Sequence, residues 1–183
     1  MRLSLQSKTE SQEGEYMSID SDLQRQVMGH FATGVTVVTT RYGDDVSGMT
    51  ANAVVSLSLD PPLILVCVDL ESSMHGMLTS SDCFAVNMLR ADQQELSKRF
   101  AKPGPKDFSG IELKTAQTGA PIFLDAIAYA DCKITEIIRG GDHDMFIGQM
   151  VAGEVGDGKP LIFYGGQYGS LESDEKSGRT SSD

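Results

Sequence analysis

The sequence has few cysteines and histidines, and their spacing matches neither a disulfide framework nor a metal site. Cys67, Cys83 and Cys132 stand far apart, without CxxC spacing, each in an apolar, strand-like context. Such cysteines are expected to be buried thiols in a reducing compartment. The three histidines are equally scattered, so no Cys/His cluster of the structural zinc type is present. The sequence therefore predicts no bound metal.

Long apolar runs and common catalytic motifs are also missing. No run approaches the roughly 20 residues that cross a bilayer, and residues 1–22 lack the continuous apolar stretch of a secretory signal. We therefore expect a cytoplasmic protein. The GxSxG, Walker, HExxH and GxGxxG motifs do not occur. A nicotinamide cofactor, if one is used, is thus not held by a Rossmann fingerprint.

Basic residues are outnumbered, 15 against 26 acidic ones, which gives a net charge of −11. This balance argues against nucleic acid and membranes as partners, because both require a basic surface. Residues 1–22 carry five acids against two bases, and residues 172–183 carry four against two. Both ends are also rich in serine, a composition typical of disorder. We predict a disordered acidic tail over 1–19, one domain over 20–171, and a disordered tail over 172–183.

Three helices are predicted from apolar spacing and capping signals. Residues 20–31 carry apolar side chains four residues apart, and residues 73–80 form a shorter helical segment. A third helix is expected to begin at Asp92, since Glu95 follows three residues later as in a capping box.

Strand signals dominate the rest of the chain. They fall at residues 35–40, 46–59, 63–68, 84–89, 128–135, 145–155 and 161–164. Many short strands with about three short helices favour a mainly β barrel or sandwich. A doubly wound α/β sheet is not expected, because strands and helices do not alternate.

Residues 48–59, GMTANAVVSLSL, form the most informative segment. Taken as one strand, positions 51 to 59 give an apolar face at the odd numbers, while the even numbers from 50 to 58 carry short polar groups apart from Val54. Such a wall lets a flat heterocycle approach the backbone, and Thr50 and Asn52 can meet its polar edge. The alternative is a solvated outer strand face, although this one carries no charged side chain.

A local basic cluster stands out in the acidic chain. Lys98, Arg99, Lys102 and Lys106 place four of the 15 bases within nine residues, with no acid among them. An acidic protein that binds a phosphorylated cofactor needs such a positive site to offset its own field. The alternatives are bases favoured by a helix C-terminus and a solvated lysine-rich loop.

Residues 140–144, GGDHD, are typical of a hairpin turn. His143 lies next to the predicted strand that follows, so it is placed to project from a strand mouth into a site. The alternative is a turn histidine with a structural role or none.

In their order along the chain, eight segments resemble the flavin reductase family that supplies reduced flavin to two-component monooxygenases. They are HFATGVTVVTT (30–40), GMTANAVVSLSLDPPLILVCV (48–68), FAVNML (84–89), LSKRFA (96–101), DFSGI (107–111), GAPIFLDAIAYADCKI (119–134), GGDHDMFIGQM (140–150) and PLIFYGGQYGSL (160–171). Each segment is weak by itself. The eight in order are specific, and they span about residues 22–171.

The resemblance implies an FMN-binding split barrel, that is, a Greek-key-type six-stranded barrel with a few short flanking helices. It also implies a homodimer with flavin at or near the subunit interface. The implied activity is that of an NAD(P)H-dependent flavin reductase, an oxidoreductase that transfers hydride from NADH or NADPH to FMN or FAD. A partner monooxygenase would receive the reduced flavin.

The resemblance also assigns residues. His143 would line the nicotinamide side as the candidate catalytic residue. The implied cofactor-binding positions are Gly48, Met49, Thr50, Ala51, Asn52, Ser56, Leu57, Ser58, Arg99, Phe100 and Tyr168. Among these, Arg99 and Phe100 would lie near the phosphate or ribityl end of the flavin.

Two features depart from the family pattern. Val54 stands where many relatives have an aromatic residue, and the acidic tails are not part of the pattern. Two alternatives therefore stay open at this point. One is a flavin-binding electron carrier or sensor without nicotinamide-dependent activity, and the other is a scaffold barrel without a cofactor.

Overall fold

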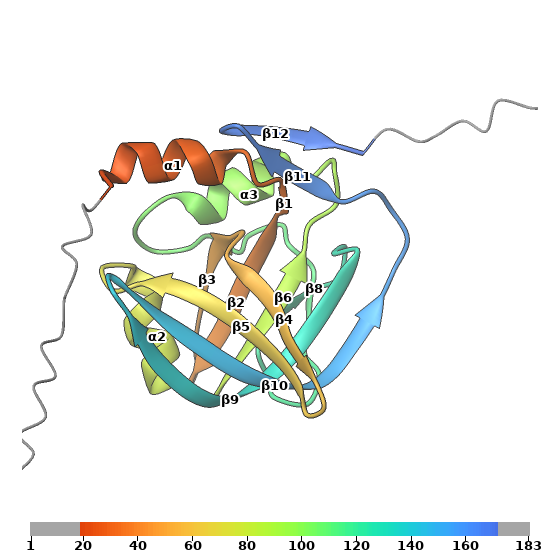
Figure 1. Ribbon diagram of the computed structural model, residues 1–183. Helices are drawn as coiled ribbons and strands as arrows, with labels where there is room; N and C mark the ends of the chain where they lie inside the picture. Colours follow the sequence, from red (N-terminus) through yellow and green to blue (C-terminus); the bar gives the residue numbers. More distant parts are fainter. Residues whose placement is uncertain (1–18, 172–183) are drawn as a thin grey trace, which may run out of the picture.

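The computed structural model describes residues 19–171 and is mainly β, as expected (Figure 1). Within these residues there are three helices, α1 (Ser21–Gly29), α2 (Ser73–Ser80) and α3 (Gln94–Ala101). The strands of the described part are β1 (Thr33–Gly34), β2 (Thr36–Tyr42), β3 (Asp45–Ala51), β4 (Val54–Leu59), β5 (Pro62–Asp69), β6 (Cys83–Met88), β7 (Leu113–Lys114), β8 (Ile122–Phe123), β9 (Ala128–Gly140), β10 (His143–Val155), β11 (Leu161–Tyr164) and β12 (Gln167–Ser170). The predicted tails lie outside the described residues, apart from residue 19. None of the described helices combines the length and apolar character needed to cross a membrane.

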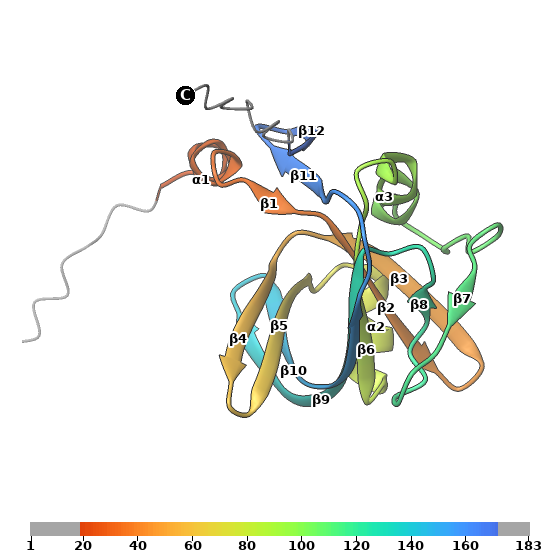
Figure 2. The ribbon, with the colours of Figure 1, turned by 90° about the vertical axis from the view of Figure 1, so that its right-hand side faces the viewer.

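One antiparallel sheet wraps around most of the molecule. Among the described residues it has seven strands in the order β3-β2-β6-β9-β10-β5-β4, and Figure 2 shows it curling so that β4 and β5 face β2 and β3. A separate three-stranded sheet of β1, β11 and β12 lies beyond one end of this barrel, next to α1. The short pair β7 and β8 lies outside the barrel on the side of β6 (Figure 2).

The prediction of one continuous strand over residues 46–59 is wrong. β3 ends at Ala51 and β4 begins at Val54, and the two strands form opposite edges of the large sheet. The break is fixed by two hydrogen bonds: the Thr36 hydroxyl donates to the Ala51 carbonyl at 2.7 Å, and the Cys67 amide donates to the Ala53 carbonyl at 3.0 Å. The large sheet has seven strands in the described residues, where the resemblance implied a six-stranded barrel. Residues on either side of the break do not share one strand face.

The third helix also begins later than predicted. α3 starts at Gln94, and its N-cap residue Gln93 makes no side-chain capping bond. The Asp92 carboxylate accepts instead from the Arg90 guanidinium, with Nε and Oδ1 2.7 Å apart. The predicted capping box is therefore wrong, because the acid is taken by a stronger, charge-assisted donor.

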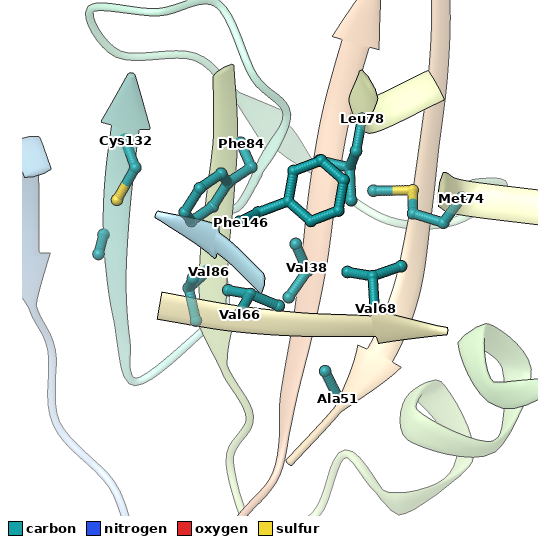
Figure 3. Close-up of a cluster of buried hydrophobic side chains, with 11 residues drawn as sticks. Val38, Ala51, Val66, Val68, Met74, Leu78, Phe84, Val86, Cys132 and Phe146 are labelled. Atoms are coloured by element: carbon teal, nitrogen blue, oxygen red, sulfur yellow. The ribbon is translucent and has the colours of Figure 1, made fainter. Parts of the chain in front are cut away.

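The barrel interior is filled by side chains from strands on all sides (Figure 3). Phe84 on β6 and Phe146 on β10 are fully buried at its centre. Met74 and Leu78, also fully buried, bring α2 onto the same cluster. Burying each of these side chains contributes roughly 1.5–3 kcal/mol. α2 is thereby fixed to the barrel beside the strand ends that form the candidate site.

A second apolar cluster holds α3. Phe100 from this helix packs with Phe123, and their ring centroids are 5.4 Å apart. The other buried members of the cluster are Val35, Val37, Leu89 and Leu161. The small sheet and α3 are therefore held together by a core separate from that of the barrel.

Close packing around Gly148 in β10 generates a prediction about stability. A Cβ at this position would lie 2.6 Å from Cε1 of Phe84 and 2.9 Å from Cβ of Cys132. Gly148→Ala is expected to lower the free energy of unfolding by about 1–3 kcal/mol, because the core has to shift to admit one carbon. Urea unfolding measures the difference.

The matched control is Gly169→Ala in β12, where an added Cβ meets nothing within 4 Å. Its free energy of unfolding should stay within about 0.5 kcal/mol of that of the unmodified chain. Equal losses in the two variants would contradict the packing argument.

Candidate functional site

A cleft of about 500 Å³ opens at one end of the barrel beside α3. Five parts of the chain meet there: the residues at the end of β3, the end of β5, the turn into α2, the end of α3 with its following loop, and the start of β10. Its lining residues are Met49, Thr50, Ala51, Asn52, Ala53, Cys67, Asp69, Glu71, Ser72, Ser73, Phe100, Ala101, Lys102, Pro103, Gly104, Lys106 and His143. A concave site with convergent polar groups is where a small ligand is expected to bind.

One wall of the cleft is the segment 49–53, where the chain leaves β3 after Ala51. Most of the side chains here are small, so a flat ring can come close to the backbone. The Thr50 hydroxyl donates to the Ser97 carbonyl at 2.6 Å, which ties this wall to α3. Asn52 is exposed and also lines two neighbouring cavities of about 250 and 630 Å³. Three hollows therefore meet at Asn52.

Gly48 supports the cleft from behind and does not line it. A Cβ on Gly48 would lie 2.9 Å from Cε1 of Phe100 and 3.2 Å from Cγ2 of Thr39. The absence of a side chain lets Phe100 pack directly on β3. Phe100 is only 1% exposed, yet it forms part of the cleft floor. Its ring is held by Phe108, with centroids 5.0 Å apart.

Two lysines on the loop after α3 give this side of the cleft a positive charge. Lys102 and Lys106 both line the cleft. The Lys106 ammonium donates to the carbonyls of Phe100 and Lys102, the first at 3.2 Å. Partial burial lowers the pKa of Lys106. The ammonium groups are suitable partners for a phosphate.

The other two bases of the predicted cluster lie elsewhere. Lys98 is exposed and pairs with Glu95, with Nζ and Oε1 2.7 Å apart. Arg99 donates to the Ser109 carbonyl at 2.9 Å and lines a different hollow on the far side of α3. The structure therefore divides the cluster, and only its second half faces the cleft.

The opposite rim carries His143 and the acids Asp69 and Glu71, which all line the cleft. His143 begins β10 and is paired in register with Asp69 at the end of β5. Its ring Nδ1 lies 2.8 Å from the carboxylate of Asp142, and the hydrogen bond from His143 holds the pKa of Asp142 below its usual value. The Leu70 amide donates to the Asp142 carbonyl at 3.1 Å, which fixes the hairpin tip against the end of β5. Glu71 completes this rim.

A buried ion network supports the same rim from below. Asp144, the second residue of β10, has a side chain only 9% exposed. Its two oxygens lie 2.7 Å from Nε2 of His75 on α2 and 2.7 Å from Nε of Arg139 on β9. The hydrogen bond from His75, followed by that from Arg139, lowers the pKa of Asp144 despite its burial. The network fixes α2 to the strand that carries His143.

The residues of the cleft suit a flat heterocycle with an anionic tail. The segment 49–53 offers small side chains next to a polar edge, and the two lysines lie on one side of it. The volume of about 500 Å³ is in the range of ligand pockets. An anionic tail would be drawn toward Lys102 and Lys106 and repelled from Asp69 and Glu71.

The structure brings together only part of the predicted set. Met49, Thr50, Ala51, Asn52, Phe100 and His143 line the cleft. Tyr168 lines the adjacent cavity of about 250 Å³, which shares Thr50 and Asn52 with the cleft. Ser56 lines the cavity of about 630 Å³ on the β4 side, while Leu57 and Ser58 lie farther along β4, outside the cleft. Gly48 and Arg99 take the positions described above.

The predicted site residues did not include the end of β5 and the turn from β5 into α2. Cys67, Asp69, Glu71, Ser72 and Ser73 all line the cleft. The available signal was the change from the apolar run at 63–68 to polar residues, which marks the mouth of a strand. That signal does not indicate which other residues lie beside the turn, because only the pairing of β5 with β10 places it next to His143.

Known proteins match most of the described residues of this chain. The family model described as the flavin reductase like domain matches residues 28–172. The reductase component of the 4-nitrophenol 4-monooxygenase/4-nitrocatechol 2-monooxygenase of Rhodococcus opacus is 37% identical, over 79% of this chain and 78% of that protein. The FMN reductase (NADH) SmoA of Agrobacterium fabrum is 37% identical, over 79% of this chain and 83% of that protein.

A solved structure gives the same result for the fold. The NADH:FAD oxidoreductase of Streptomyces globisporus, in complex with NAD and FAD fragments, superimposes with a TM-score of 0.80 at 36% identity. The match covers 85% of this chain and 95% of that chain. The resemblance drawn from eight sequence segments is thereby confirmed, and so is the split-barrel fold.

The buried network around Asp144 generates a prediction about pH. A carboxyl whose pKa is lowered on folding stabilises the protein above its unfolded pKa, and this contribution is lost as the pH falls through the folded value. Asp144→Asn should therefore lower the free energy of unfolding at pH 7. The deficit relative to the unmodified chain should shrink as the pH falls below about 4, where unfolded Asp is protonated. Urea unfolding at a series of pH values measures it.

Asp44→Asn, in the exposed turn between β2 and β3, is the matched control. It should change stability little at any of these pH values. A deficit in Asp144→Asn that stays constant from pH 7 to pH 3 would show that the charge of Asp144 is not the stabilising element.

Proposed function

The chain belongs to the flavin reductase family, and we propose that its cleft transfers hydride from NADH or NADPH to FMN or FAD. The observation that carries this proposal is the arrangement of the cleft itself. A wall of small residues at 49–53 is flanked by Lys102 and Lys106 on one side and by His143 on the other. The names of the relatives support the same reaction, since they include an FMN reductase that uses NADH and an NADH:FAD oxidoreductase.

The isoalloxazine is proposed to lie against the segment 49–53. Thr50 and Asn52 meet the polar edge of the ring, and the small side chains of this segment allow close contact with the backbone. Residues 52 and 53 lie between β3 and β4, outside the strands, so their backbone is placed to stabilise negative charge on the reduced ring. Lys102 and Lys106 offset the charge of the flavin phosphate.

The nicotinamide is proposed to enter from the His143 side. The bound cofactors supply the hydride chemistry, which requires their reacting atoms to approach to about 3–3.5 Å. His143 orients the nicotinamide or its carboxamide and moves no proton. Its ring is held in place by Asp142, 2.8 Å away, and the hairpin tip is held by the end of β5.

The partner of the reaction is proposed to be a monooxygenase. The relative from Rhodococcus opacus is the reductase component of such a system. A protein that reduces flavin for another enzyme has to exchange flavin with it, and an open cleft allows this exchange. We place the reaction in the cytoplasm, where three free cysteines stay reduced.

A homodimer is proposed from the apolar face of α1. No residue of this helix is buried. Leu23 and Val27 on the helix are 45% and 60% exposed, and Phe31, two residues beyond its end, is 67% exposed. The neighbouring cavity of about 630 Å³ runs from this helix to β4 and is lined largely by apolar groups. Thr33 lines this cavity, and its buried hydroxyl has no hydrogen-bond partner in the described residues. A second copy would cover this face and the cavity beside Asn52.

The activity is tested without oxygen. Purified protein is mixed with FMN or FAD, NADH or NADPH is added, and the visible absorbance of the oxidised flavin is followed. Rapid bleaching is expected, and His143→Ala should raise the KM for the nicotinamide about tenfold while flavin affinity changes less than twofold, because His143 is placed on the nicotinamide side. Bound flavin that stays oxidised with either nicotinamide would leave the carrier or sensor alternative.

The matched control is His30→Ala. His30 follows α1 and bonds the Tyr164 hydroxyl, 3.1 Å away, outside the cleft. The His30→Ala variant should bleach flavin at the same rate as the unmodified chain. Steady-state kinetics of His143→Ala that equal those of His30→Ala would remove His143 from the site.

The dimer is tested by sedimentation. The unmodified chain should sediment as a dimer, and Val27→Glu should shift it toward the monomer because a charge is placed within the covered apolar face. Leu113→Glu is the control, since Leu113 is 42% exposed on β7, away from α1. A monomeric unmodified chain, or a dimer that survives Val27→Glu, would contradict the proposed interface.

A further inference from the structure

Two hydrogen bonds join the cleft wall to the hairpin of β11 and β12 through Ser97 in the middle of α3. The Thr50 hydroxyl donates to the Ser97 carbonyl at 2.6 Å. The Ser97 hydroxyl in turn lies 3.0 Å from the hydroxyl of Tyr168 on β12. Ser97 itself is fully buried, whereas its two partners are half-buried. The three residues come from β3, α3 and β12, which are far apart in the sequence.

The first of these bonds fixes what Thr50 can offer to a ligand. A threonine hydroxyl has one proton and two acceptor lone pairs. Because the proton of Thr50 is donated to the Ser97 carbonyl, its hydroxyl oxygen can act toward a ligand only as an acceptor, through its two lone pairs. The wall at Thr50 is therefore specific for a donor on the bound molecule, such as an imide N–H or a ribityl O–H of a flavin.

The second bond fixes where α3 lies relative to the wall. Tyr168 is half-buried and stacks edge-on with Phe163 of the same hairpin, with ring centroids 5.3 Å apart. The Tyr168 hydroxyl contacts Ser97, the residue of α3 whose carbonyl accepts the hydrogen bond from Thr50. The next turn of α3 carries Phe100 and Ala101 into the cleft. A shift of this helix would therefore move the acceptor of Thr50 and the cleft floor together.

We propose that Ser97 and Tyr168 are positioning residues that hold Thr50 as a hydrogen-bond acceptor for the flavin. The proposal rests on the function proposed above and adds two residues that act through a third. Neither needs to touch the flavin, since Ser97 is buried behind the wall and Tyr168 lines the adjacent cavity.

The hairpin offers a matched pair of variants for the test. Tyr168→Phe removes the hydroxyl that reaches Ser97, whereas Tyr164→Phe removes the hydroxyl that reaches His30. Both tyrosines belong to the β11–β12 hairpin, and both changes remove one oxygen. Any general weakening of the hairpin should be similar in the two variants, and thermal unfolding measures it.

Flavin affinity is measured by titration of FMN and FAD fluorescence, and activity by the anaerobic bleaching assay. Tyr168→Phe is expected to raise the Kd and KM for flavin roughly fivefold, as for one lost hydrogen bond, with kcat changed less than twofold. Tyr164→Phe should match the unmodified chain. Ser97→Ala should reproduce Tyr168→Phe, and the double variant should be no weaker than either single one, because both remove the same bond.

Thr50 variants test the last step of the inference. Thr50→Val removes the acceptor and should weaken flavin binding at least as much as Tyr168→Phe. Thr50→Ser keeps the hydroxyl and should bind flavin more tightly than Thr50→Val. The inference would be overturned if Tyr168→Phe and Tyr164→Phe bound flavin with equal affinity. It would also be overturned if the losses of flavin affinity in Ser97→Ala and Tyr168→Phe multiplied in the double variant. An unmodified chain that neither binds nor reduces flavin would overturn the proposed function, and this inference with it.

Discussion

The candidate site depends on how the chain crosses from one edge of the large sheet to the other. β3 and β4 follow each other in sequence, separated by two residues, yet they form the two edges of the seven-stranded sheet of the described residues. Two residues can connect the end of β3 to the start of β4 only because the sheet curls until these two edge strands approach each other (Figure 2). The bridge is then fixed by the Thr36 hydroxyl and the Cys67 amide. The backbone that leaves the ladder here becomes the cleft wall, so the site follows from incomplete closure of the barrel.

Much of the fold was predictable from local pattern. The alternation over 128–135 and the β-branched run at 35–40 indicate strands, and the structure has β9 and β2 there. The break at residues 52–53 was not predictable from pattern, because the small residues on both sides of it fit a continuous strand equally well. Only the sheet order, which depends on contacts between segments distant in sequence, separates Ser56 from Thr50. For the same reason the turn after β5 was missed as part of the site.

The two rims of the cleft differ in charge, although the chain as a whole carries −11. Lys102 and Lys106 stand on the α3 side, and Asp69 and Glu71 stand beside His143. A ligand with phosphate at one end and a neutral ring at the other therefore has one favourable orientation. The prediction of a basic cluster at residues 98–106 contained this information only in part. The helix turns Lys98 and Arg99 away, and that direction depends on which face of α3 is packed by Phe100.

The small sheet has a consequence for the order of folding. β1 lies near the start of the described chain and pairs with β11 near its end, with Thr33 opposite Phe163. Contacts of such long sequence separation form late, because closing a long loop costs entropy before any contact is gained. The barrel strands up to β10 are also synthesised before β11 and β12. The apolar cluster that contains Val35, Leu89 and Phe100 is therefore complete only after Leu161 has packed against it. The helix that borders the cleft is consequently secured last, so a nascent chain can hold a formed barrel before it holds a formed site.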